Sequence, residues 1–325
     1  MGVKRKITKA KEASTSITDA KEAYLEEKKA LNKSASTIKN IDYTLEKWIS
    51  YIVSSGRDES ISQVDESYVY SFMNSCLNED MKPTSLNHYL RDIRAFCYWC
   101  MEKGYIVKAF KIQLATGQQP IKETYSDEDV LKLIARPSKK ASFVEWRSWA
   151  IINWILATGN RAQTVCEITL GDLNFYKGEI MIRYTKTNKA QIIPMSKALS
   201  VVLKDYIKMW RSEAPDSGYL FPNVGDEKLT VNALKHSITN YNQNREVDII
   251  SVHALRHTFA KNWIRNTGDV FRLQKMLGHT TLEMTRQYVN MFEEDLKEDF
   301  EEYNPLDRIK KTASRTQKVK KSSDK

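Results

Sequence analysis

Apolar residues recur with helical spacing in two separate parts of this chain, and the stretch between them carries no such pattern. The break runs from Lys111 to Lys122 and contains the turn-forming residues Thr116-Gly117-Gln118-Gln119-Pro120. A stretch of this kind is typical of a linker. With 325 residues, the chain is long enough for two domains that each bury a core. We therefore expect one domain over residues 17–110 and a second over 123–303.

The first part is predicted to be entirely helical. Its clearest helix has an apolar face made by residues three or four positions apart, namely Ile38, Ile41, Leu45, Trp48, Ile49 and Ile52. Ser36 and Thr37 stand where this helix would be capped, and Gly56 stands where it would end. A second helix would begin at Pro83, a residue suited to a first helical turn, and would end before Gly104.

The second part combines helices with a small sheet. Ser126, followed by three acidic residues, marks the start of a helix. A nearly all-apolar run from Trp149 to Leu156, which ends at Gly159, predicts a buried helix. Alternating residues over 180–184 predict a strand, and 191–194 its hairpin partner. The fold class we expect is mainly α with a small antiparallel β-sheet, which makes the second domain α+β.

The charge of the chain favours a polyanionic partner. The net charge is +10 and the isoelectric point is near 9.2, and basic proteins of this kind gain affinity for nucleic acid through counterion release. A basic arm over residues 1–16 and a tail over 304–325 carry no apolar pattern. The tail holds eight Lys or Arg against two Asp, so we expect it to be disordered when the protein is free.

Two features of the sequence exclude other classes of protein. No apolar run approaches the ~20 residues that span a bilayer, and no apolar stretch follows the basic N-terminus, so we expect a cytoplasmic protein. Cys97 and Cys100 form a CxxC pair within a helical pattern. Because no second pair completes a zinc ligand set, we interpret both as core residues.

A set of polar residues stands beside the expected buried elements, and its members are Arg161, Lys186, His253, Arg256, His279 and Tyr288. Two guanidiniums can hold the non-bridging oxygens of a phosphodiester and stabilise a pentacoordinate phosphate. Histidines can hydrogen-bond the same oxygens or move protons. A lysine can protonate a leaving hydroxyl, and a tyrosine can attack phosphorus and hold the product as an ester. That ester conserves the bond energy, so the chemistry needs no ATP, metal or other cofactor.

The order of these residues resembles the tyrosine recombinases, the phage integrase family. The string HALRH over 253–257, then Leu277-Gly278-His279, then Tyr288 nine residues later is similar to the family's C-terminal signature. The upstream TGNR over 158–161 and TKT over 185–187 resemble its first arginine and its strand-turn lysine. The helical first part is similar to the family's core-binding domain, which has a SAM-like fold.

The resemblance implies a role for each residue. Arg161 and Arg256 would be the arginine pair, Lys186 the general acid, and Tyr288 the nucleophile. His253 and His279 would assist at the phosphate. Double-stranded DNA would be the partner, held partly by Lys39, Asn87, Arg91 and Arg94, and a homotetramer would form on it. The segment 291–303 would dock on a neighbouring protomer, and a directionality factor could take part.

Some alternatives stay open. Many family members carry an acid where Thr164 stands, and Lys189 is a second lysine in the hairpin. We interpret His257 as capping or packing beside Arg256. The spacing of His253 and His257 would also suit zinc, but Ala254 excludes the metalloprotease motif.

Integration or excision of a mobile element is the function we expect. A Xer-type resolvase, a type IB topoisomerase and a non-catalytic DNA-binding protein are the alternatives.

Overall fold

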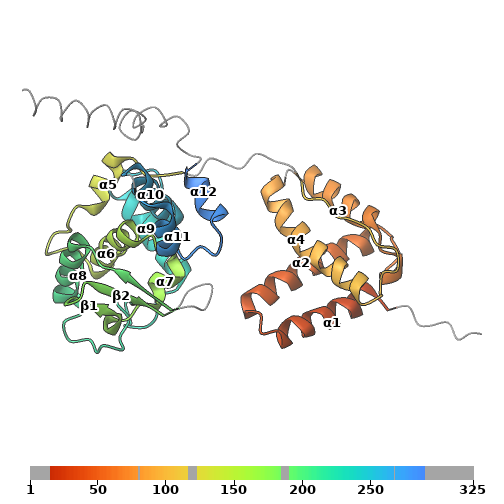
Figure 1. Cartoon of the computed structure of the whole chain (residues 1–325), viewed down its shortest axis with the longest axis horizontal. Coiled ribbons are helices and arrows are strands. Elements are labelled where there is room, and N and C mark those ends of the chain that lie inside the picture. Colours follow the sequence, from red (N-terminus) through yellow and green to blue (C-terminus); the bar gives the residue numbers. More distant parts are fainter. Residues whose placement is uncertain (1–14, 80, 116–122, 184–189, 267, 290–325) are drawn as a thin grey trace, which may run out of the picture. The chain divides into compact units, whose positions relative to one another are not determined.

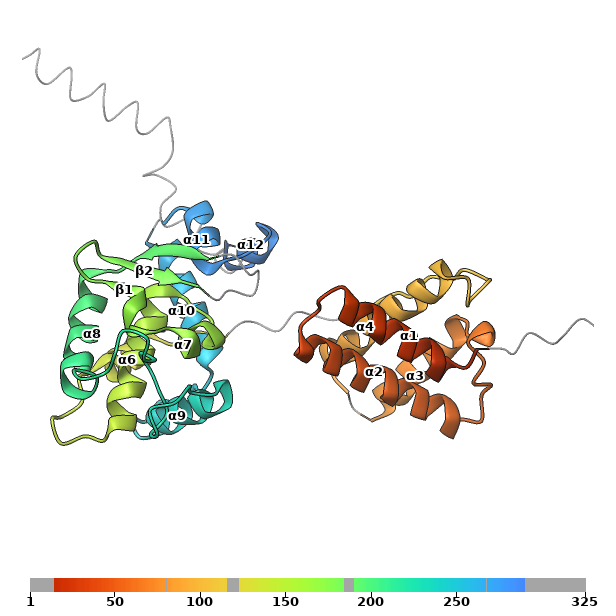
Figure 2. The ribbon, with the colours of Figure 1, turned by 90° about the horizontal axis from the view of Figure 1, so that it is seen from below.

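A computed structural model describes residues 15–79, 81–115, 123–183, 190–266 and 268–289. The chain divides into two compact units, residues 1–120 and 121–325, so the division lies within the stretch 111–122 (Figures 1 and 2). The predicted basic arm, except for its last two residues, and the basic tail lie outside the described residues. So do the 291–303 segment and Lys186.

Among the described residues of the first unit, the elements of regular structure are helices, as the sequence predicts, and an isolated β-bridge joins Ser16 to Ser60. Its helices are α1 (Ile17–Ala30), α2 (Ala35–Ser54), the 3-10 turn η1 (Ile61–Gln63), α3 (Glu66–Asn78) and α4 (Pro83–Glu102). The cap of α2 is Ser34, whose hydroxyl accepts a hydrogen bond from the Thr37 backbone amide, and not Ser36 or Thr37 as predicted. Pro83 begins α4 as expected.

The core of this unit combines aliphatic residues with a cluster of aromatic rings between the helices. Helices α1, α2 and α4 all pack against one another, and α3 packs against α2 and α4. Trp48 and Phe96 are fully buried, and the Phe96 ring centroid lies 5.4 Å from that of Tyr24 in an edge-on arrangement. Cys97 and Cys100 are buried in the same core as free thiols. Apolar burial therefore holds the unit together.

The second unit contains helices and one sheet. Its elements are α5 (Asp127–Ile134), α6 (Phe143–Thr158), α7 (Ala162–Glu167), η2 (Leu170–Asp172), β1 (Leu173–Asn174), β2 (Glu179–Ile182), β3 (Gln191–Pro194), α8 (Lys197–Trp210), α9 (Val231–Gln243), α10 (Val252–Arg265), α11 (Val270–Leu277) and α12 (Glu283–Val289). Mainly helical structure with a small antiparallel sheet confirms the predicted fold class.

The sheet has the order β1-β2-β3, with antiparallel neighbours. Ile180 pairs with Ile193, and Ile182 pairs with Gln191. Ile180, Ile182 and Ile193 are buried, whereas Ile192 is 57% exposed, because alternate residues of a strand face opposite sides. The predicted hairpin is confirmed over these strands, and the turn between them lies outside the described residues.

Helix α6 is the centre of the second unit. It packs against α5, α8, α9 and α10, and ten of its residues are buried, including Trp146 and Trp154. A helix that is apolar on all sides is stable only when other elements surround it, as they do here (Figures 1 and 2). The C-terminal end of α6 is therefore fixed in the interior of the unit, where the chain continues toward Arg161.

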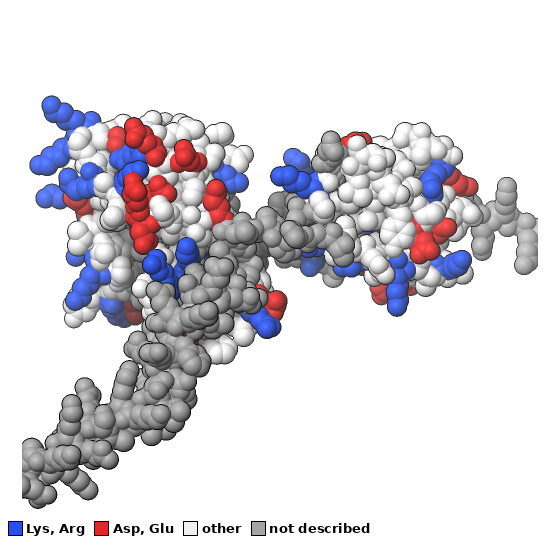
Figure 3. All heavy atoms as spheres, turned by 90° about the horizontal axis from the view of Figure 1, so that it is seen from above, with Lys and Arg blue, Asp and Glu red and all other residues white. Residues whose placement is uncertain are grey.

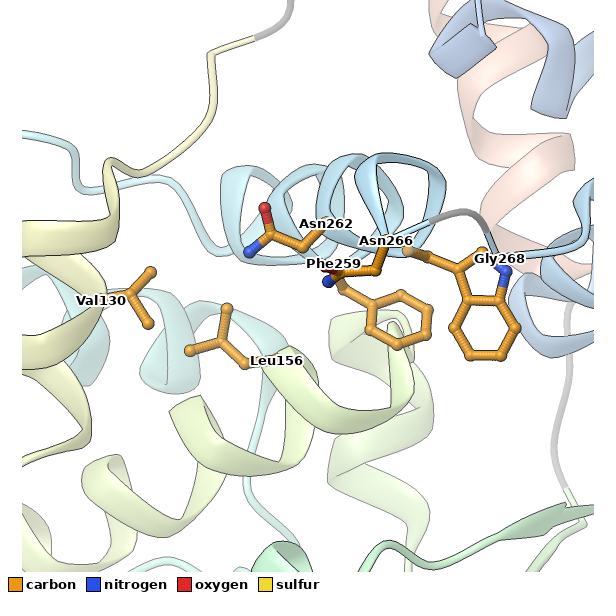
Figure 4. A pocket seen from close by; sticks show the side chains of 7 residues that line it. Val130, Leu156, Phe259, Asn262, Asn266 and Gly268 are labelled. Carbon is orange, nitrogen blue, oxygen red and sulfur yellow. The ribbon is translucent and has the colours of Figure 1, made fainter. Parts of the chain in front are cut away.

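An apolar hollow of about 490 Å³ lies beside α10 (Figure 4). It is lined by Val130, Leu156, Phe259, Asn262, Trp263, Asn266 and Gly268. The Phe259 ring also contacts Gly159, at the end of α6. Phe259 therefore lines the hollow and also packs against the end of α6.

The surface shown in Figure 3 carries both signs of charge. On this face of each unit, lysines and arginines are visible together with aspartates and glutamates. The described residues visible on this side therefore do not form a surface of one sign. Among the described helices, none is both long and apolar enough to cross a membrane.

Candidate active site

Gly159 forms the turn that leads from α6 to Arg161. Its φ of 65° is left-handed, and a Cβ here would lie 2.4 Å from Phe259 Cδ1 and 2.7 Å from Leu277 Cδ2. Only glycine meets both conditions without strain. Asn160 stabilises the turn by accepting a hydrogen bond from Trp154 Nε1 at 2.9 Å. Arg161 follows as the N-cap of α7, with its position set by this turn.

Arg256 lies at the centre of the site and is only 4% exposed. Its Nη1 donates to the Gly159 carbonyl at 2.6 Å, and its Nη2 donates to the Leu277 carbonyl at 2.9 Å. Arg161 Nη1 donates to the same Leu277 carbonyl at 3.3 Å. The ends of α6 and α11 thus hold two guanidiniums side by side. Burial lowers the pKa of Arg256 to about 10, and the adjacent Arg161 adds to this effect, so Arg256 stays charged at neutral pH.

His279 is fixed in orientation by hydrogen bonds at both ring nitrogens. Gly278 ends α11 in the left-handed conformation, with a φ of 60°, as the sequence predicts. Nε2 of His279 lies 2.9 Å from Arg256 Nη2, and Nδ1 lies 2.8 Å from Thr285 Oγ1. Because a guanidinium only donates, Nε2 accepts, and Nδ1 of the neutral ring carries the proton and donates to Thr285. This arrangement requires the neutral form of His279.

Tyr288 lies on α12 beside these groups and is 2% exposed. Its hydroxyl is 2.9 Å from Nδ1 of His257, and its ring is parallel to that of His279 with centroids 6.3 Å apart. Burial raises the pKa of the Tyr288 hydroxyl above its ordinary value near 10. A hydrogen bond from Arg256 and the charges of Arg256 and Arg161 act in the opposite direction. The phenol therefore faces two cations, the buried Arg256 and the half-buried Arg161.

His257 corrects the interpretation from sequence. We expected it to cap or pack beside Arg256, but the structure places its ring against Tyr288, with centroids 5.6 Å apart. His253 is exposed one turn earlier on α10, and its ring centroid is 5.6 Å from that of His257. The spacing of four residues on a helix could have indicated that these histidines lie together. Nothing local could have indicated the contact with Tyr288.

The structure brings together most of the residues singled out in the sequence. Arg161, Arg256, His279 and Tyr288 meet at one point, and His253 is adjacent to them through His257. Lys186 falls outside the described residues. The strand that follows it begins at Gln191, whose side chain contacts the Met276 carbonyl on α11 at 3.5 Å. That end of the hairpin therefore lies beside the helix that leads to His279.

The region after Arg161 lacks the acid that many family members carry. Thr164 is half-buried in this position. Glu167 pairs with Lys228 and accepts a hydrogen bond from Gln163 at 2.7 Å, so its carboxylate is used away from the arginines. Among the described residues there is no group of three or more His, Cys, Asp and Glu side chains that could bind a metal ion together.

A second candidate surface lies on the first unit. Lys39 and Arg91 are exposed, and Arg94 is half-buried. The side-chain amide of Asn87 donates to the Ala115 carbonyl and accepts from the Ala115 amide, both at 2.8 Å. Asn87 thus anchors the chain after α4, a use that the sequence did not indicate.

A polar groove between α2 and α4 was also missed from the sequence. It is lined by Asn40, Tyr43, Thr44, Ser85, His88 and Tyr89. Tyr43 is 62% exposed at its edge. These residues come from two helices that are far apart in the chain, and their juxtaposition depends on how the helices pack.

Comparison with known proteins identifies the family. The model of the phage integrase family matches residues 124–295, more than half of the chain. The chain belongs to this family. It is a tyrosine recombinase, an enzyme of DNA strand breakage and rejoining.

Curated relatives agree with this assignment over most of the chain. Tyrosine recombinase XerD of Listeria innocua is 25% identical over 279 residues, which cover 84% of this chain and 93% of the relative. Tyrosine recombinase XerA of Pyrococcus furiosus is 27% identical over 285 residues, which cover 82% of this chain and 95% of the relative. The similarity therefore includes both units.

Solved structures show the same fold. The Tn1549 transposon integrase, in complex with a circular intermediate DNA, aligns with a TM-score of 0.69 and 19% identity over 85% of this chain and 95% of its own. The XerH recombinase, bound to a palindromic difH substrate, aligns with a TM-score of 0.67 and 20% identity over 87% of this chain and 83% of its own.

Proposed function

We propose that this protein is a site-specific recombinase that integrates or excises a mobile element, with Tyr288 as the nucleophile. The observation that carries the proposal is the position of the Tyr288 hydroxyl, which lies buried against Arg256, Arg161 and His257. A phenol held beside two cations is suited to attack a phosphodiester, because the same cations neutralise the charge that develops on phosphorus.

The two arginines bind the phosphate in this proposal. Arg256 is oriented by donating to the carbonyls of Gly159 and Leu277, and Arg161 donates to the Leu277 carbonyl alone. The remaining N–H groups can bind non-bridging oxygens. His279 holds Arg256 in place through Nε2. In this proposal its ring would lie beside the bound phosphate. These donors are already oriented before DNA binds, which is the condition for strong transition-state stabilisation.

The remaining steps would use Lys186, which is outside the described residues, and the exposed His253. Lys186 would protonate the departing 5′-oxygen, and His253 would hydrogen-bond the phosphate from the exposed end of α10. The product is a 3′-phosphotyrosine, and a 5′-hydroxyl of a second duplex reverses the reaction. Since the ester conserves the energy of the broken bond, no cofactor is required.

We further propose how DNA is held. Lys39, Arg91 and Arg94 of the first unit would contact the phosphate backbone, with Asn87 contributing less because Ala115 occupies its amide. Four protomers would act on two DNA sites and exchange strands through a Holliday junction. The segment 291–303 of each protomer would dock on the next. A directionality factor would set the direction of exchange, and the reaction would take place where the DNA is, in the cytoplasm.

A Xer-type resolvase is the second candidate. The observation that favours it is the match to XerD and XerA relatives over more than four fifths of the chain. Both candidates use the same chemistry and differ in the DNA on which they act. A type IB topoisomerase would instead relax supercoils without exchange between sites, and a DNA-binding protein would not need a nucleophile.

Covalent trapping tests the proposal. The protein is mixed with fragmented genomic DNA and denatured in detergent, and the protein-linked fragments are sequenced, with Tyr288→Phe as the control. We expect adducts from the wild type alone, with sites at the ends of a mobile element. Sites confined to one chromosomal locus without an element would favour the Xer-type function. DNA binding without any adduct would contradict both candidates.

A further inference from the structure

We propose that His257 is a catalytic residue, the general base that takes the proton from the Tyr288 hydroxyl during strand cleavage. This inference rests on the proposed function, since it assigns a role in the reaction of Tyr288. His257 is not among the six residues that the sequence singled out. The structure nevertheless places its Nδ1 atom 2.9 Å from the reacting oxygen.

The hydroxyl of Tyr288 needs a proton acceptor. Because burial raises its pKa above the ordinary value near 10, the phenol is neutral at physiological pH. A neutral phenol is a weak nucleophile, and its attack on phosphorus is faster when a base removes the proton as the bond forms. The charges of Arg161 and Arg256 favour the phenolate, but a guanidinium cannot accept the proton.

His279, which also lies beside Tyr288, is unsuited to this task. His279 is parallel to the tyrosine ring, but its Nε2 accepts from Arg256 and its Nδ1 donates to Thr285. To act as a base it would have to give up the hydrogen bond that orients Arg256. His257 Nδ1, in contrast, already contacts the hydroxyl. A neutral imidazole with its proton on Nε2 presents the Nδ1 lone pair to that oxygen.

Helix α10 and the neighbouring rings set the position of His257, which contacts Tyr288 and His253. It follows Arg256 directly on α10, between the buried residues Leu255 and Phe259 of the same helix. The base and one arm of the phosphate clamp are therefore carried by adjacent residues of one packed helix. The backbone of α10 thus sets the positions from which both side chains reach Tyr288.

The proposed step is balanced. The bond between Tyr288 Oη and phosphorus forms while the bond between phosphorus and the 5′-oxygen breaks, and the phenolic proton passes to Nδ1 of His257. In rejoining, a 5′-hydroxyl attacks phosphorus, the phosphotyrosine bond breaks, and the imidazolium of His257 returns its proton to the tyrosine. No further reactant is consumed.

The experiment measures single-turnover formation of the covalent adduct on a nicked duplex. The duplex carries the DNA sequence that covalent trapping identifies. Two versions of the duplex are compared, one with the ordinary 5′-oxygen and one with a 5′-bridging sulfur, which leaves without a general acid. The variants are His257→Ala and His257→Asn. Asparagine places a hydrogen-bonding atom near the position of Nδ1 but is not a base at neutral pH. His236→Ala, at an exposed position of α9, is the matched control.

We expect both His257 variants to slow adduct formation by about 10²–10⁴-fold on both duplexes, with DNA binding and melting temperature close to wild type. A rate within a few fold of wild type in His257→Ala would overturn the inference. So would full activity of His257→Asn, which would show a role in orientation only. Recovery of the rate on the sulfur-containing duplex would place His257 on the leaving-group side and also overturn it. In all these cases the wild type still forms the adduct, so only the role of His257 is refuted. If the wild type itself forms no adduct, the proposed function is contradicted.

Discussion

Arg256→Lys keeps the positive charge of the buried site but removes the planar fork that holds it in place. In the wild type, Nη1 reaches the Gly159 carbonyl and Nη2 reaches both the Leu277 carbonyl and Nε2 of His279. A lysine has a single nitrogen on a flexible stem, so it cannot occupy the positions of both guanidinium nitrogens. At least one buried acceptor is therefore expected to lose its donor.

The expected size of the effect differs between stability and catalysis. Leaving one buried acceptor unsatisfied costs about 1–3 kcal/mol of unfolding free energy. For a unit of this size, each kcal/mol lowers the melting temperature by roughly 2–4 °C. Loss of one oriented transition-state donor is expected to slow DNA cleavage about 10²–10³-fold. The variant should thus be folded at room temperature and nearly inactive.

Arg147→Lys provides the matched control for this prediction. Arg147 is 4% exposed, and its Nη1 donates to the Pro222 carbonyl at 2.6 Å, so it too is a buried guanidinium bound to a carbonyl. Its guanidinium also lies over the Phe143 ring, 5.3 Å from the ring centroid. Both variants are compared by thermal unfolding and by single-turnover adduct formation. If Arg256→Lys cuts DNA as fast as Arg147→Lys, the assignment of Arg256 to the phosphate clamp is wrong.

Two further substitutions test the support of the site. Gly159→Ala places a methyl group against Phe259 and Leu277 at a left-handed φ. We expect the free energy of unfolding, measured with urea, to fall by about 1–3 kcal/mol and DNA cleavage to be slower. Wild-type stability of this variant would show that the turn does not need glycine. Thr285→Val removes the acceptor for His279 Nδ1 without changing the side-chain shape, so we expect the free energy of unfolding to fall by about 1–3 kcal/mol. In that variant adduct formation should also be slower, and an unchanged rate would mean that the orientation of His279 does not matter.

Local signals in the sequence predicted the elements well. Pro83 begins α4, and Gly159 and Gly278 end α6 and α11, because each of these residues has a backbone preference that acts within a single turn. For the N-cap of α2 the sequence predicted Ser36 and Thr37, whereas the observed cap is Ser34. Several hydroxyl residues stand in a row there, and only the observed hydrogen bond distinguishes among them.

Contacts between distant residues were harder to predict. The sequence singled out Tyr288 and Arg256 through the resemblance to a family, not through a pattern that predicts their contact. The hydrogen bond between His257 and Tyr288 spans 31 residues and depends on how α12 packs against α10. The pairing of Asn87 with Ala115 spans 28 residues and likewise has no local signature. Helix spacing places a side chain on a face of its own helix but does not say what that face meets.

The proposed mechanism is tested most directly by identifying the residue that becomes linked to DNA. The wild-type adduct on the trapped site is digested with nuclease and protease, and the peptide that retains a nucleotide is sequenced by mass spectrometry. We predict that the nucleotide is attached to Tyr288 through a 3′-phosphate, and that Tyr288→Phe yields no such peptide. A nucleotide on another residue, or a 5′-phosphate link, would contradict the central claim.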